Sequence, residues 1–202
     1  MDEIKKAVKM AAGSSNIVAF TGAGVSTESN IPDFRSAGGV FSDIRSRYEY
    51  PPEVILSRSF FDSRTDLFYE FYRNRMIYRE ALPNSCHTAL AELEDMGRLK
   101  AVITQNIDGL HQAAGSRSVL ELHGGMSRNF CMACGREFSL DYVVESTEGV
   151  PCCDRCGGVV KPDVVLYEEP LNQEVIKKSV EYIREAEVLV VIGTSLVVYP
   201  AA

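Results

Sequence analysis

The stretch IVAFTGAGVST, residues 17–27, decides the fold of this chain. It opens with Ile17 to Phe20, an apolar run without alternation, which is typical of a strand buried on both faces of a parallel sheet. Gly22 and Gly24 follow at once, and glycines at this place let the backbone approach a pyrophosphate. The stretch therefore predicts the first strand and loop of a dinucleotide-binding domain, although Thr27 stands where a third fingerprint glycine would close the motif.

The rest of the chain continues the pattern of short apolar runs and amphipathic stretches. We expect further strands at the apolar runs 101–104, 119–122, 164–166 and 187–192. Helices are expected at the amphipathic stretches 2–12, 62–80, 84–96 and 172–185. Strands that alternate with helices indicate an α/β fold with a Rossmann-like parallel sheet. The residues after the last strand, Gly193, Thr194 and Ser195, then lie at the sheet edge where such folds bind ligands.

Four cysteines have the spacing of a zinc ribbon. Cys131 and Cys134 form one C-x2-C pair, and Cys153 and Cys156 form a second pair after 18 intervening residues. Each pair delivers two thiolates to one side of a tetrahedron, so two pairs complete a closed, structural Zn²⁺ site. Redox-active C-x-x-C motifs are the alternative, but neither pair lies at a strand-to-helix start. We therefore expect a small inserted zinc-ribbon module at 128–160.

The composition fits one domain with an inserted module. The 202 residues are 46% hydrophobic, and the formal net charge is −7. An acidic chain is unlike most nucleic-acid-binding proteins, and no apolar run reaches the length of a transmembrane helix. We expect neither nucleic acid nor a membrane as a partner. The N-terminus lacks the apolar segment of a signal peptide, which favours a cytoplasmic location.

His123 is the best candidate for a general base. It follows the expected strand 119–122 and precedes two glycines, at the edge where parallel sheets bind ligands. Gln105, Asn106 and Asp108 follow another expected strand in the same way. A structural role is the alternative for this histidine.

Together these motifs closely resemble one family, the sirtuins, which are NAD-dependent protein lysine deacylases. The resemblance rests on TGAGVSTESNIPDFRS (21–36), TQNIDGLH (104–111), LELHGG (120–125), the paired cysteines, KPDVVLYEE (161–169) and GTSLVVYPAA (193–202). It implies one catalytic domain over 1–202, divided into two parts. The Rossmann-like part would comprise 1–35, 84–125 and 162–202. The small domain would combine a helical part, 36–83, with the zinc module.

The resemblance also assigns roles to residues. NAD would be bound as co-substrate by Gly22, Ala23, Gly24, Thr27, Phe34, Arg35, Gln105, Asn106, Ile107, Asp108, His123, Gly193, Thr194 and Ser195. An acyl-lysine protein or peptide would add as a strand along Val165, Glu168 and Glu169.

The implied reaction is acyl transfer from lysine to ADP-ribose with release of nicotinamide. Asn106 and Asp108 would orient the ribose and the carboxamide. His123 would take a proton from a ribose hydroxyl, which then attacks the bound acyl carbon. Free lysine and O-acyl-ADP-ribose would be the other products, and the single Zn²⁺ would be structural.

Three features depart from the family pattern. Asn30 replaces a glycine before IPDFR, and because Asn tolerates left-handed backbone angles we expect the loop to be kept. Tyr167-Glu168-Glu169 stands where many members read Phe-Gly-Glu, which would alter how the peptide strand seats. The family also has a further stretch after YPAA, so we expect this chain to be a fragment with weakened NAD affinity.

Two other functions stay open at this point. Tyr72 and Arg75 resemble the pair with which sirtuins specific for acidic acyl groups hold a carboxylate, although such helix arginines are more often solvated. A succinyl- or malonyl-specific deacylase is therefore the alternative enzyme. An inactive NAD- and peptide-binding fragment is the non-enzymatic alternative. An oxidoreductase is disfavoured, since the third fingerprint glycine and an acidic ribose ligand are missing.

Overall fold

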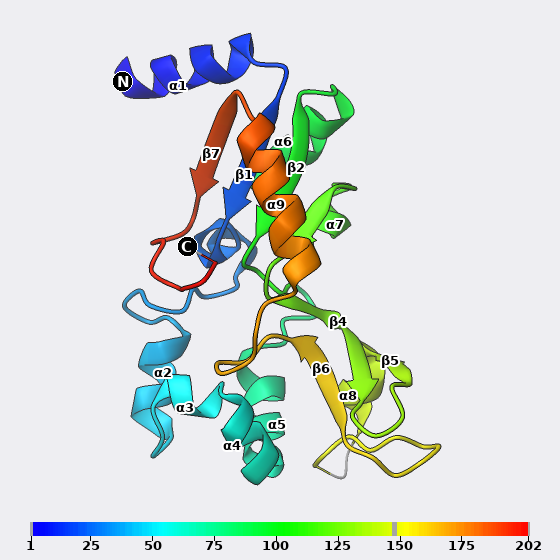
Figure 1. Ribbon diagram of the computed structural model, residues 1–202. Coiled ribbons are helices and arrows are strands. Elements are labelled where there is room, and N and C mark those ends of the chain that lie inside the picture. The colour runs from blue at the N-terminus through cyan, green and yellow to red at the C-terminus, as the bar shows by residue number, and fades with distance from the viewer. Residues whose placement is uncertain (1, 147–148, 202) are drawn as a thin grey trace.

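The structure, a computed structural model, describes residues 2–146 and 149–201. Met1, Ala202 and, within the expected zinc module, Thr147 and Glu148 lie outside the described residues. A parallel sheet with helices on both faces forms the upper part of the molecule in Figure 1. Helices α2–α5 and a small antiparallel sheet form the lower part. This arrangement confirms the predicted α/β fold.

The parallel sheet has the strand order β3-β2-β1-β7. Strand β1 is buried along its whole length because it lies between β2 and β7, as its continuous apolar run predicts. Thr21 at the end of β1 pairs with Thr104 on one side and Ile192 on the other, so three strands end at the same level. The strands are β1 (Ile17–Thr21), β2 (Leu99–Thr104), β3 (Val119–Glu121) and β7 (Val188–Ile192).

Helices cover both faces of this sheet. On one face, Ile17 and Ala19 of β1 pack in a cluster with Leu90 of α6. On the other face, Val18 and Phe20 pack in a cluster that includes side chains of α9. The helices of this part are α1 (Asp2–Gly13), α6 (Ser85–Asp95), α7 (Leu110–Ala113) and α9 (Gln173–Glu185).

The helical part has an aromatic core. Phe68 and Tyr72 of α5 stack at 5.6 Å between ring centroids, and Phe61 of α4 meets Phe68 edge to face at 4.9 Å. Tyr69 donates a hydrogen bond to the carbonyl of Val160, which ties this core to the zinc module. The helices are α2 (Val40–Arg47), α3 (Pro52–Ile55), α4 (Arg58–Ser63) and α5 (Thr65–Arg75). Two 3₁₀ turns, η1 (Ala23–Val25) and η2 (Thr27–Ser29), precede them in the chain.

The zinc module contains an antiparallel sheet of strand order β5-β4-β6. Strand β4 pairs with β6 from Gly124 and Val164 at one end to Cys131 and Val160 at the other. One end of this strand pair therefore lies beside His123, and the other end carries a cysteine of the expected zinc site. The elements are β4 (Gly124–Cys131), β5 (Glu137–Ser139), α8 (Leu140–Glu145) and β6 (Val160–Val164).

The expected strand at 164–166 is wrong in two respects. Strand β6 ends at Val164, and it pairs antiparallel with β4 instead of joining the parallel sheet. Leu166 is nevertheless buried, in the core of the helical part. A short apolar run indicates that a segment is buried, but it does not show which of the two sheets the segment joins.

Two expectations about helices also need correction. The stretch 62–80 is not one helix, because Arg64 has a non-helical backbone that separates α4 from α5, and α5 ends at Arg75. An apolar residue at the end of the expected helix 84–96 predicts that Met96 faces inward, but it is 67% exposed as the residue that ends α6. Among residues 2–146 and 149–201, none of the helices has the length and apolar character needed to cross a membrane.

Candidate functional site

The loops that follow β1 and β7 lie back to back. The amide of Gly22 donates to the carbonyl of Ile192 at 3.0 Å, and the amide of Gly24 donates to the carbonyl of Gly193 at 2.8 Å. A Cβ added to Gly24 would lie 2.9 Å from the Gly193 Cα, and one added to Gly193 would lie 2.4 Å from the Val25 nitrogen. Gly193 also has φ of +63°, which disfavours other residues. These glycines are therefore needed for loop contact, a reason that sequence reasoning did not give.

A buried polar network lies beside these loops. Ser26 donates a hydrogen bond to an Asp108 carboxylate oxygen at 2.7 Å, and the Asn106 side-chain amide donates to the Ser26 hydroxyl at 3.1 Å. The other oxygen of Asp108 accepts from the amide of Leu110 at 2.9 Å, so the carboxylate is fixed. The structure thus brings Asn106 and Asp108 together. Ser26, which sequence reasoning missed, joins them.

Polar side chains from three loops converge at the mouth of the site. Gln105 donates to the Thr194 hydroxyl at 3.0 Å, and the Arg35 guanidinium donates to the Ser195 hydroxyl at 3.4 Å. Ile107 accepts a hydrogen bond from the amide of Met126 through its backbone carbonyl at 3.0 Å. Phe34 packs edge to face on Phe41 at 5.6 Å, as part of the helical core. Thr27 donates to the carbonyl of Gly24 at 2.9 Å, within the first loop.

His123 lies between β3 and β4, beside the end of β2. Its Nδ1 atom is 2.9 Å from the backbone carbonyl of Gln105. A carbonyl only accepts, so Nδ1 carries the proton and Nε2 is left with a lone pair. Burial lowers the pKa of His123, and the hydrogen bond to Gln105 opposes this only in part. The imidazole is therefore neutral at pH 7, which suits a general base.

The other two histidines are buried away from solvent. His87 accepts a hydrogen bond from the amide of Asn84 and helps to cap α6, and its ring lies 4.8 Å from that of His111. His111 contacts the Thr21 hydroxyl through Nε2 at 3.0 Å. Burial lowers the pKa of both rings, that of His111 to about 4. These histidines stabilise the fold around the strand ends and leave His123 as the base candidate.

The segment 164–169 runs from the zinc module past His123 to α4. The amide of Val165 donates to the carbonyl of His123 at 3.0 Å. Glu168 and Glu169, expected along the peptide groove, both direct their carboxylates toward residues at the start of α4. Glu168 has φ of +76°, a backbone conformation that favours glycine. This agrees with the glycine that many sirtuins place there.

The four predicted zinc ligands come together at the end of the β4–β6 pair. The Sγ atoms of Cys131, Cys134, Cys153 and Cys156 all lie within 4.8 Å of one another. Two pairs are separated by 3.4 and 3.7 Å. A Zn–S bond of about 2.3 Å in a tetrahedron places thiolates about 3.8 Å apart, so the cluster fits Zn²⁺. Four protein ligands leave no open position, which makes a structural site.

Tyr72 and Arg75 lie on α5 in the helical part. Tyr72 is 1% exposed, and its hydroxyl has no hydrogen-bond partner within the part of the chain that the structure describes. Arg75 lines a surface hollow together with Tyr48, Glu70 and Asn74. The acidic-acyl alternative therefore stays a prediction.

The fold and site define a dinucleotide-binding group-transfer enzyme with a zinc ribbon. The model of the Sir2 family matches residues 22–200, and this chain belongs to that family. It is 59% identical over 202 residues to an NAD-dependent protein deacetylase of Clostridium tetani, covering 100% of this chain and 81% of the relative. For the protein of that name from Clostridium acetobutylicum, the identity is 57%, with 100% and 82% covered.

A solved structure shows the same relationship. A Sir2 protein with a deacetylated p53 peptide and 3′-O-acetyl ADP ribose is 37% identical, with a TM-score of 0.88. The match covers 98% of this chain and 79% of that chain. The resemblance seen in the sequence is thereby confirmed.

Proposed function

We propose that this chain is an NAD-dependent protein lysine deacetylase in which His123 is the general base. The names of its relatives and the contents of the matched Sir2 structure support the reaction. The observation that carries the role of His123 is its hydrogen bond to the Gln105 carbonyl, which leaves Nε2 as a base at the carboxyl edge of the sheet.

NAD fits the edge of the sheet where β1, β2 and β7 end. The two loops that touch through Gly24 and Gly193 supply one wall, and Arg35, Thr194 and Ser195 supply hydrogen-bond donors for phosphate or ribose oxygens. When bound, NAD supplies the ADP-ribosyl group that accepts the acetyl group as nicotinamide is released. The residues proposed to contact it are Gly22, Ala23, Gly24, Thr27, Phe34, Arg35, Gln105, Asn106, Ile107, Asp108, His123, Gly193, Thr194 and Ser195.

The fixed polar network orients the reacting groups. Asp108 and Asn106 are held through Ser26, so they present a preset arrangement to the ribose and the carboxamide. His123 Nε2 accepts the proton of a ribose hydroxyl, and the Gln105 carbonyl stabilises the imidazolium that results. The protein thus fixes the positions of these polar groups before the substrate binds.

The acetyl-lysine peptide is proposed to add as a strand along the segment that contains Val165. This segment is bonded to His123, which places a peptide bound there next to the base. The zinc module holds the other end of β6 and takes no part in the chemistry, because its metal site is closed. A cytoplasmic location fits thiolate ligands that must stay reduced.

The test is to incubate the chain with NAD and an acetyl-lysine peptide and to search for O-acetyl-ADP-ribose by mass spectrometry. The unmodified chain should form it, and His123→Ala should lower the rate by about 10² to 10⁴-fold. Calorimetry should show that His123→Ala still binds NAD. Absence of the product with the unmodified chain would remove the proposed function, and near-normal turnover by the variant would remove His123 as the base.

A further inference from the structure

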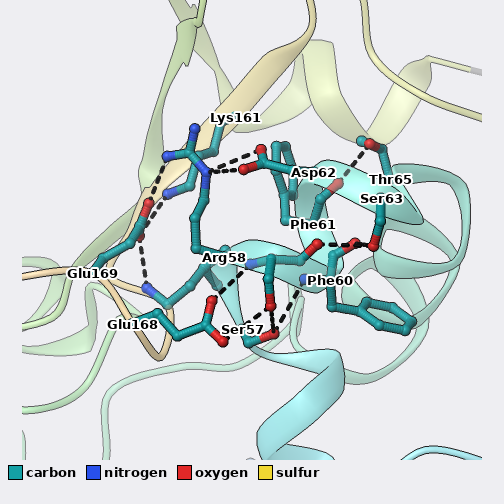
Figure 2. A network of polar contacts seen from close by, with 12 residues as sticks. Ser57, Arg58, Phe60, Phe61, Asp62, Ser63, Thr65, Lys161, Glu168 and Glu169 are labelled. Carbon is teal, nitrogen blue, oxygen red and sulfur yellow. Dashed lines mark hydrogen bonds and ion pairs between the residues drawn. The ribbon is translucent and has the colours of Figure 1, made fainter.

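Helix α4 and the segment 161–169 are joined by a network of charged side chains. Arg58 bonds Asp62 through Nε and a Glu169 oxygen through its terminal nitrogen at 2.9 Å. The other Glu169 oxygen accepts from Lys161 at 3.1 Å and from the amide of Leu166 at 2.8 Å. Figure 2 shows the Arg58 guanidinium between the two carboxylates, with Lys161 beside it.

Glu169 is the centre of this network. Its side chain is 17% exposed and that of Lys161 is 13% exposed, whereas Asp62 is 50% exposed. Arg58, Lys161 and the Leu166 amide together lower the pKa of Glu169 against the opposing effect of burial, so the carboxylate is ionised. A partly buried carboxylate with two cations and an amide is fixed in one position.

The residues that Glu169 holds belong to the segment proposed to bind the peptide. Lys161 also donates to the carbonyl of Val164 at 2.9 Å, and the amide of Glu169 donates to the carbonyl of Leu166 at 3.0 Å. The Glu169 side chain therefore connects the start of the segment 161–169, at Lys161, to its end. Between them lies Val165, whose amide is bonded to the carbonyl of His123.

The backbone at the start of helix α4, and just before it, also contacts the same segment. The backbone amide of Tyr167 donates to the carbonyl of Leu56 at 2.9 Å, and the Tyr167 carbonyl accepts from the amide of Arg58 at 3.0 Å. The backbone bonds and the Arg58–Glu169 ion pair thus connect the segment to Leu56 and to the first residue of α4. Neither carboxylate oxygen of Glu169 remains without a protein partner.

We infer that Glu169 is a positioning residue, which joins Arg58 and Lys161 so that the segment 164–167 keeps the place at which acetyl-lysine peptide binds. It acts through these cations and not by contact with the substrate. Loss of the carboxylate leaves Lys161 largely buried without its ion-pair partner, a state that the protein relieves by moving the segment. If the binding arrangement falls to about a tenth of the molecules, the apparent affinity for peptide falls about tenfold.

The experiment compares Glu169→Gln with the unmodified enzyme. We expect the peptide KM and the Kd of a fluorescent acetyl-lysine peptide to rise about tenfold, with kcat at saturating peptide and the KM for NAD within about twofold. Asp62→Asn is the matched control, because it removes an ion pair from the same Arg58 but no contact with the segment. Its peptide KM should stay within about twofold of normal.

A second variant separates positioning from general damage. Lys161→Met combined with Glu169→Gln removes the buried cation together with its anion, and it should recover part of the lost peptide affinity. If Glu169→Gln does not fold alone, folding of the double variant is expected, with a peptide KM still above that of the unmodified enzyme, and a normal KM there would contradict the inference. An unchanged peptide KM in the folded Glu169 variant, an equal rise in Asp62→Asn, or a loss of kcat alone would overturn the inference.

The inference rests on the proposed function, but the two fail differently. An unmodified chain that binds the peptide without turnover would remove the proposed function, while the peptide Kd values would still decide the role of Glu169.

Discussion

Glu168 occupies a backbone position that suits glycine, and its side chain offsets the cost. With φ of +76°, a residue other than glycine is strained by about 1–2 kcal/mol. The Glu168 carboxylate accepts from the amide of Ser59 at 2.9 Å and from its hydroxyl at 3.0 Å. These bonds lie at the surface, so we assign them roughly 0.5–1 kcal/mol each. The free energy of the backbone strain and that of the two hydrogen bonds are therefore of similar size.

Replacement of Glu168 by alanine and by glycine separates the two effects. Glu168→Ala keeps the strain and loses both bonds, so we expect the free energy of unfolding to fall by about 1–2 kcal/mol. Glu168→Gly loses the same bonds but relieves the strain, so its stability should stay within about 0.5 kcal/mol of the unmodified chain. The alanine variant should then melt about 2–4 °C below the glycine variant for each kcal/mol between them.

The assay is urea unfolding followed by circular dichroism, since the chain has 9 tyrosines and no tryptophan. Glu181, exposed within α9, is the matched control. There the order should reverse, with glycine less stable than alanine by about 1 kcal/mol. If alanine at 168 proved as stable as glycine, the left-handed strain at this position would be refuted.

The remaining predictions concern zinc, pH and acyl specificity. A strong chelator should lower the melting temperature and unfold the zinc module, because metal binding and folding are coupled; an unchanged melting temperature in a zinc-free sample would contradict this. Stability should fall as pH drops from 6.5 toward 4, because burial lowers the pKa of His111 to about 4, so the unfolded state binds more protons in that range. The loss should reach at most about 3 kcal/mol from this residue, and urea midpoints that do not change between pH 7 and 4.5 would refute it. The acid limb of kcat/KM should lie below pH 6.5, since burial lowers the pKa of His123, and a limb above 6.5 would exclude it as the titrating base. Acetyl-peptide should be turned over faster than succinyl-peptide, and the reverse order, abolished by Arg75→Met, would favour the acidic-acyl alternative.

The features that could be predicted from the sequence are encoded locally. The burial of β1 follows from four consecutive apolar residues, and the zinc cluster follows from two C-x2-C pairs whose geometry is nearly independent of the fold. The position of His123 beside Gln105 could be predicted because both residues follow strands of one parallel sheet, whose carboxyl ends share an edge.

The features that could not be predicted depend on partners far apart in the chain. Ser26 is 80 residues from Asn106, and Arg58 is 111 residues from Glu169. Neither pair has a local pattern, because charged and hydroxyl side chains at such positions are equally common on solvated surfaces. The exposure of Met96 likewise follows from its place at the end of α6, which hydrophobicity alone does not reveal.

The contact between the loops of β1 and β7 has a consequence for synthesis. Strand β1 emerges from the ribosome early and β7 late, yet Gly24 and Gly193 must meet to form one wall of the proposed NAD site. Until then β1 can pair on one side only, and its free edge is open to wrong partners. Binding of NAD therefore cannot guide folding of the nascent protein until β7 and Gly193 have been made.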